Sequence, residues 1–152
     1  MIENPNRNSA FDQSAEAGIG GWLILPAVGL VVGPVFGVIG VVYALNLYSL
    51  AQNSGYGTMY FLELSVNMGA IIFGVYTAMN FFGKKRAVPT IFIAWLTACI
   101  VARGALMVIE FGAGAEVLAV ESGKKFLRDI VIAALWIPYL KLSTRVKLTF
   151  VN

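Results

Sequence analysis

The heptapeptide Gly83-Lys84-Lys85-Arg86-Ala87-Val88-Pro89 separates two apolar runs, residues 59–82 and 90–111. Each run is long enough to cross a bilayer, because a membrane-spanning α-helix takes about 20 apolar residues. Short loops rich in Lys and Arg stay on the cytoplasmic side of a membrane. We therefore expect this cationic turn to lie in the cytoplasm, where the first run arrives from outside and the second run leaves again.

The composition is that of a chain whose solvent is lipid. Its 152 residues are 59% hydrophobic and 12% charged, with a mean hydropathy of +0.79, whereas soluble domains carry about 25% charged residues. The net charge is +3, but the cations are scattered along turns and tails and do not form the basic footprint of a nucleic-acid-binding protein. The composition indicates an integral membrane protein with no nucleic-acid partner.

The residues that usually build catalytic and metal sites are scarce. The chain has no histidine, and most zinc, haem and imidazole-based sites depend on that side chain. The single cysteine, Cys99, lies in an apolar run, so no intrachain disulfide can form and a small buried residue is expected. No phosphate-binding glycine loop or nucleophile elbow is present. We expect no catalytic residue, no metal and no cofactor, and hence no enzyme.

The expected fold class is an all-α membrane protein with four transmembrane helices, the first of them kinked. The helices are expected at about residues 23–48, 59–82, 89–111 and 125–142, within a transmembrane domain of residues 19–142. Residues 1–18 are expected to form a polar cytoplasmic tail and residues 143–152 a basic one. The loop at residues 112–123 should lie outside, with a short interfacial helix at residues 116–120.

The distribution of cations predicts the side on which each terminus lies. Seven Lys or Arg residues belong to the two tails and the cationic turn, against two in the outer loops, Lys124 and Lys125. Because cytoplasmic loops carry the excess of Lys and Arg, this distribution predicts that both termini are cytoplasmic.

The first helix carries a glycine ridge and a proline. Gly29, Gly33 and Gly37 recur every four residues, with Gly40 close by, and such a ridge lets another helix approach closely. The alternative interpretation is the general enrichment of glycine in membrane helices. Pro34 follows Gly33 directly, and a proline at this position is expected to kink the helix.

A cluster of polar residues is expected in the outer half of the bilayer. Its members are Glu63, Asn67, Arg103, Glu110, Arg128 and Asp129. A lone charge at mid-bilayer costs about 2.5–3.5 kcal/mol on insertion scales, so Arg103 should face inward and pair with a carboxylate. The expected partner is Glu63 on the neighbouring helix. Asn67 and Glu110 are expected to add further bonds.

Two interpretations of this cluster stay open. The first is a structural network in which two cations nearly cancel three anions, because pairing is how buried charges are tolerated. The second is a polar cavity, open to the outside, that binds a small solute, an ion, a quinone head or a partner helix, since ionisable residues inside a membrane are functional candidates.

The two ends of the chain resemble a known family. The matching residues are Ile19-Gly20-Gly21-Trp22-Leu23 and Pro26 at the front, and Trp136-Ile137-Pro138-Tyr139, Ser143, Arg145-Val146-Lys147 and Thr149-Phe150-Val151 at the back. In these residues the chain is similar to the YdgK-like bacterial membrane proteins, domain-of-unknown-function family 2569. The resemblance implies a small four-span inner-membrane protein and no established activity. The middle of the chain matches only as apolar spans.

The basic tail alternates polar and apolar residues from Arg145 to Phe150, which is the period of a strand. Such a strand could add to the sheet edge of a partner. The interpretation we favour has the cations on anionic headgroups while the apolar residues dip into the interface.

These observations rank the possible functions. The leading one is a non-enzymatic subunit or interaction protein that is held together by the glycine ridge and docks other membrane proteins through it. The alternative is a small-solute or ion transporter or binding protein that uses the polar cluster, as a homodimer because four helices leave little room for a pathway. The expected partners are the lipid bilayer and either another membrane protein or a second copy of the chain.

Overall fold

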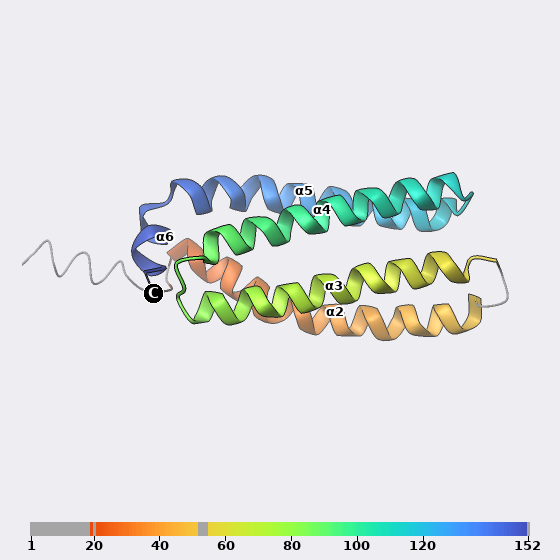
Figure 1. Ribbon diagram of the computed structural model, residues 1–152, viewed down its shortest axis with the longest axis horizontal. Coiled ribbons are helices and arrows are strands. Elements are labelled where there is room, and N and C mark those ends of the chain that lie inside the picture. The colour runs from red at the N-terminus through yellow and green to blue at the C-terminus, as the bar shows by residue number, and fades with distance from the viewer. Residues whose placement is uncertain (1–18, 20, 52–54, 152) are drawn as a thin grey trace, which may run out of the picture.

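Four long antiparallel helices form two hairpins, and a short helix closes one end (Figure 1). The structure is a computed structural model that describes residue 19 and residues 21–51 and 55–151. Its elements are η1 (Gly21–Leu23), α2 (Ile24–Ala51), α3 (Gly57–Phe82), α4 (Val88–Gly112), α5 (Glu116–Leu142) and α6 (Thr144–Thr149). Within these ranges there is no strand. The expected tail at residues 1–18, Gly20, the side chain of Arg145, and Asn152 lie outside the described residues.

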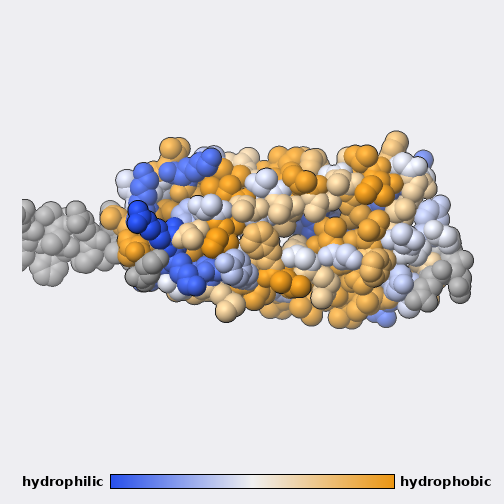
Figure 2. All heavy atoms as spheres, viewed as in Figure 1, coloured by the Kyte–Doolittle hydropathy of each residue, from blue (hydrophilic) through white to orange (hydrophobic). Residues whose placement is uncertain are grey.

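Helix α2 pairs with α3, helix α4 pairs with α5, and the two hairpins meet along α3 and α4. Three segments among the described residues are long and apolar enough to cross a membrane: Gly21–Ala51, Gly57–Phe82 and Val88–Gly112. Apolar side chains cover much of the visible surface, and hydrophilic residues gather at the end where α6 lies (Figure 2). The expectation of an all-helical protein with several apolar spans is confirmed.

The turn between α3 and α4 reverses the chain within five residues. Lys84 adopts a φ of 51°, a left-handed conformation that non-glycine residues rarely take and that suits a tight turn. Pro89 then stands in the first turn of α4, where its missing N–H costs nothing because that group has no partner inside the helix. The predicted junction at residues 83–89 is therefore the point where one hairpin passes to the next.

Helix α5 begins earlier than the sequence suggested. The expected loop with a separate short helix is wrong, because Glu116–Leu142 is one continuous helix. The reversal is made in only three residues, with Gly114 at a φ of 73°. Gly123 does not end the helix, because the sulfur of Met107 lies 3.3 Å from where a Cβ on Gly123 would be and packs that face against α4.

The C-terminal tail is also helical. The predicted strand is wrong, because Thr144–Thr149 forms α6. Val146 and Phe150, four residues apart, are 1% and 3% exposed, and the ring of Phe150 packs edge-on against Phe81 at a centroid distance of 5.2 Å. Residues four apart share one face of a helix, so this turn of helix buries its apolar side chains on the end of the bundle.

Most of the buried apolar core lies at the end closed by α6. Leu23, Ala27 and Leu30 join side chains from α3, α4, α5 and α6 in one cluster. Beyond Leu30, only Ala44 and Ala51 of α2 are buried. The helix continues unbroken through Pro34, and its first turns lean toward α4 and α6 before it follows α3 (Figure 1). Helix α2 is thus anchored at one end and exposed along much of its length.

Candidate functional site

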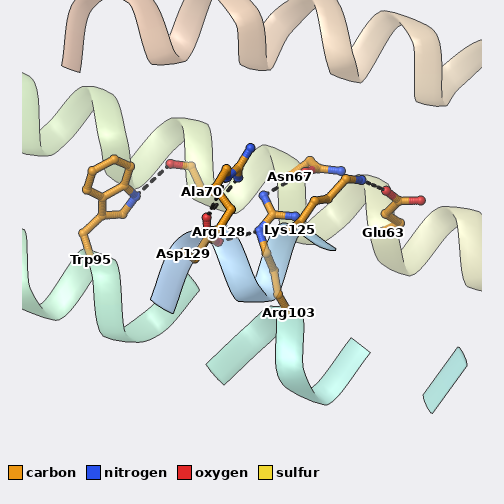
Figure 3. Close-up of polar contacts among 8 residues, drawn as sticks. All are labelled: Glu63, Asn67, Ala70, Trp95, Arg103, Lys125, Arg128 and Asp129. Carbon is orange, nitrogen blue, oxygen red and sulfur yellow. Dashed lines mark hydrogen bonds and ion pairs between the residues drawn. The ribbon is translucent and has the colours of Figure 1, made fainter. Parts of the chain in front are cut away.

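An intramembrane polar cluster links α3, α4 and α5 (Figure 3). We use this name for the six residues expected from the sequence together with Lys125. Arg103 is its centre and is 7% exposed. Its Nε donates a hydrogen bond to Oδ2 of Asp129 at 2.8 Å, and its Nη2 donates to Oδ1 of Asn67 at 3.3 Å. One buried guanidinium therefore connects three helices.

The expected pairing of Arg103 with Glu63 is wrong. Glu63 instead accepts a hydrogen bond from Nζ of Lys125, a residue that the sequence placed in an outer loop. The physical reason is the rotation and register of α5 against its neighbours, which spacing along a single helix does not reveal. Lys125 and Asp129 lie four residues apart on one face of α5, and Lys125 reaches Glu63 of α3 while Asp129 reaches Arg103 of α4.

Asp129 holds two cations. Besides Arg103, the Nε and Nη2 of Arg128 donate to its Oδ1 at 3.1 and 2.9 Å. The side chain of Arg128 is 60% exposed, whereas that of Asp129 is 10% exposed. Asp129 was expected near the outer surface, but it follows thirteen residues after Glu116, roughly 20 Å along α5 at 1.5 Å per residue. Asp129 is thus the carboxylate that accepts hydrogen bonds from both arginines of the cluster.

Glu110 lies apart from these bonds. It is 0% exposed, and neither of its carboxylate oxygens has a hydrogen-bond partner among the described residues. The Ser122 side chain of α5 lies close to it, and the charges of Glu63 and Lys125 act on it. The further bond that Glu110 was expected to add is not formed among the described residues.

A hollow of about 280 Å³ lies between α3 and α4, next to the cluster. Its walls are apolar side chains of both helices, and Arg103 is among the lining residues. The indole of Trp95 donates a hydrogen bond to the carbonyl oxygen of Ala70 at 3.1 Å across this hollow, and its ring covers Gly74. The sequence reading missed Trp95, although an indole in mid-span, where its N–H needs a partner, was the available signal.

The glycine ridge is only partly used inside the chain. A Cβ on Gly37 would lie 2.7 Å from Cγ1 of Ile71, so α3 approaches α2 closely there. A Cβ on Gly29, Gly33 or Gly40 would meet nothing within 4 Å. Among the four ridge glycines, Gly37 is thus closely approached by α3, and the other three border open space.

The residues of the two terminal motifs converge at the end of the bundle closed by α6. Pro26 is buried, and Trp22, next to the buried Leu23, is 70% exposed. Trp136 and Tyr139 pack edge-on at 5.7 Å, while Pro138 lies inside α5 and is exposed. Ser143 occupies the N-cap position of α6 without a side-chain capping hydrogen bond, and of the α6 residues Lys147 is exposed and Thr149 is buried. The motifs therefore build one structural unit, although they come from opposite ends of the chain.

Comparison with known proteins agrees with this unit. The family described as "Protein of unknown function (DUF2569)" matches residues 16–151. The chain belongs to the DUF2569 family. It is 32% identical to the "Inner membrane protein YdgK" of Escherichia coli (strain K12) over 147 residues, which cover 88% of this chain and 94% of that protein. No solved structure matches.

The DUF2569 match extends the resemblance beyond the two ends. It runs from before η1 to beyond α6, so the intramembrane polar cluster and the glycine ridge both lie within the matched region. Chemically, the cluster is a set of ion pairs together with one carboxyl group, that of Glu110, which has no hydrogen-bond partner among the described residues. Among the residues that the structure describes, no group of three metal-binding side chains gathers.

Proposed function

We propose that this DUF2569 protein is an inner-membrane protein that crosses the bilayer four times, with α5 as the fourth span and both termini in the cytoplasm. Helix α5 has 27 residues and packs along α4, which supports a span of equal length. Its buried charges are compensated, since Lys125 pairs with Glu63 and Asp129 pairs with Arg103. Paired charges are tolerated inside membrane bundles, so the charge content of α5 is compatible with insertion.

The topology is tested by reporter fusions. A reporter that is active only outside the cytosol, fused after Asn152, should be inactive, and the same reporter inserted at Gly114 should be active. An active reporter at Asn152 together with an inactive one at Gly114 would show that the orientation is the reverse of the proposed one. Equal activity at both sites would show that α5 does not cross the bilayer.

We propose further that the protein is a non-enzymatic subunit that docks another membrane protein through α2. The observation that carries this proposal is the glycine ridge, in which Gly29, Gly33 and Gly40 border open space. Helices in lipid associate by close packing at small residues, and of the four ridge glycines only Gly37 is closely approached by another described helix. The ridge therefore offers another helix a packing surface at Gly29, Gly33 and Gly40, beside the contact that Gly37 makes with α3.

Substitutions that differ only in their face of α2 test this docking. The double variant Gly29→Leu/Gly33→Leu fills the ridge, whereas Val31→Leu/Val35→Leu enlarges side chains roughly opposite to it, at the same spacing. Both valines are exposed. Purification from native membranes in mild detergent should yield a stoichiometric partner with the wild type and the valine variant, and not with the glycine variant. Partner yields that are equal in both variants would contradict docking through the ridge.

A second candidate function is the binding or transport of a small solute. The hollow of about 280 Å³ beside Arg103 supports it, because an apolar pocket that ends in a cation suits a small amphiphile. Flux in vesicles containing only the purified protein, lost on Glu63→Gln, would favour transport. Absence of flux together with a stable hetero-partner would favour the subunit.

A further inference from the structure

We propose that Glu110 is a proton-binding site inside the bundle. Its side chain is fully buried and neither carboxylate oxygen is hydrogen-bonded within the described part of the chain. Helix α4, which carries it, is one of the three candidate membrane spans. An ionised carboxylate in such surroundings loses its hydration without compensation, whereas taking up a proton removes the charge. The ligand that this site takes is therefore a proton.

The groups around Glu110 leave it without a counter-ion. Two charged side chains act on it, Glu63 from α3 and Lys125 from α5. Glu63 opposes a second negative charge, and the ammonium group of Lys125 already donates to Glu63. Arg103 and Arg128 are both bound to Asp129. Asp129 thus pairs with both arginines and Glu63 pairs with Lys125, and Glu110 forms no ion pair among the described residues.

The surroundings also argue against a larger ligand. The side chain of Glu110 is 0% exposed, and Glu110 lines neither the hollow beside Arg103 nor the one along α2. The nearby Ser122 hydroxyl can either donate or accept a hydrogen bond, so it can serve a protonated carboxyl as well as an ionised one. A proton fits such a buried carboxyl without displacing a neighbouring side chain.

The position of Lys125 gives this site a consequence for the bundle. Lys125 bridges α5 to α3 through Glu63, and its charge also acts on Glu110. Loss of the proton from Glu110 would leave two carboxylates competing for one ammonium group. Proton release should therefore weaken the Lys125–Glu63 bridge, so the state of Glu110 governs how firmly the two hairpins are joined.

Infrared spectroscopy tests the site in the full-length protein, purified in a detergent without ester groups. At neutral pH the wild type should show the carbonyl band of one protonated carboxyl group per chain. That band should be absent from Glu110→Gln, and in the wild type it should give way to a carboxylate band as the pH is raised. The control is Glu121→Gln, because Glu121 is exposed and paired with Lys124. Its difference spectrum should show loss of a carboxylate.

Two results would overturn the proposal. One is a wild-type spectrum with no protonated-carboxyl band at neutral pH, which needs no variant at all. The other is a Glu110→Gln difference spectrum that shows loss of a carboxylate. Thermal unfolding adds a second measurement, since Gln mimics the neutral acid and should leave the Tm unchanged at neutral pH, while a lower Tm in that variant would count against a neutral Glu110. Neither measurement depends on docking through α2, so a failure of the Glu110 proposal can be distinguished from a failure of the docking proposal.

Discussion

Replacing Asp129 by Leu should destabilise the protein far more than replacing its partner Arg103 by Met. Without Asp129, the buried Arg103 keeps only the 3.3 Å bond to Asn67, and removing one partner of a buried ion pair costs about 3–5 kcal/mol. Without Arg103, Asp129 still accepts two hydrogen bonds from Arg128. The loss should then be about 1.5–3 kcal/mol, the value of hydrogen bonds to a charged group.

The double variant should recover most of this loss. Replacing both partners of a buried ion pair by apolar residues is often close to neutral, so Arg103→Met/Asp129→Leu should unfold within about 1 kcal/mol of the wild type. The two effects would then be strongly non-additive, well beyond the roughly 0.5 kcal/mol expected for independent sites.

Unfolding by sodium dodecyl sulfate in mixed micelles, followed by tryptophan fluorescence, measures these differences. Glu121→Leu is the matched control, because it removes an exposed ion pair on the same helix and should leave the midpoint unchanged. The reasoning is refuted if the two single variants cost the same and their effects add in the double variant, since Arg103 and Asp129 would then not be coupled.

Four further substitutions probe the packing. Gly37→Ala should lower the free energy of unfolding by about 1–3 kcal/mol in the same assay, the usual range for overpacking, because the new Cβ would lie 2.7 Å from Ile71. Gly40→Ala should leave it unchanged or raise it slightly, because a Cβ there meets nothing within 4 Å. Phe150→Ala empties a buried site on the end of the bundle and should cost about 3–5 kcal/mol, while membrane insertion, measured by carbonate extraction, stays complete. Trp95→Phe removes one interhelical hydrogen bond and should lower the free energy of unfolding by about 0.6–1.7 kcal/mol, the range measured for such bonds in membranes; no change at all would mean that the indole N–H is not bonded in the folded protein.

The apolar helices could be predicted from the sequence because polar or charged residues separate one apolar run from the next. The second and third helices were placed within two residues of α3 and α4, since the cationic turn and Pro89 mark where a helix must stop and start. The fourth helix was placed nine residues too late. The reason is that its first half carries six charged residues, whereas the prediction relied on apolar content to locate each helix.

The pairing inside the polar cluster could not be read in the same way. Spacing along one helix shows that Arg103 and Glu110 share a face, and both are indeed buried. Which carboxylate meets Arg103 depends on the rotation and register of a different helix. In the structure Asp129 takes that place, because α5 presents this residue to α4.

The amino-acid sequence by itself determined that this is a helical membrane protein, where three of its spans begin and end, and which polar residues must avoid lipid. Length and hydropathy are enough for that, because a bilayer demands about 20 apolar residues per span and internal satisfaction of every backbone polar group. Only the tertiary structure decided that Arg103 pairs with Asp129, that Lys125 bridges to Glu63, that α6 closes one end, and that neither carboxylate oxygen of Glu110 is hydrogen-bonded among the described residues. Lipid-facing and buried helix faces are equally apolar, so hydropathy does not reveal how each helix is rotated, and rotation sets these contacts.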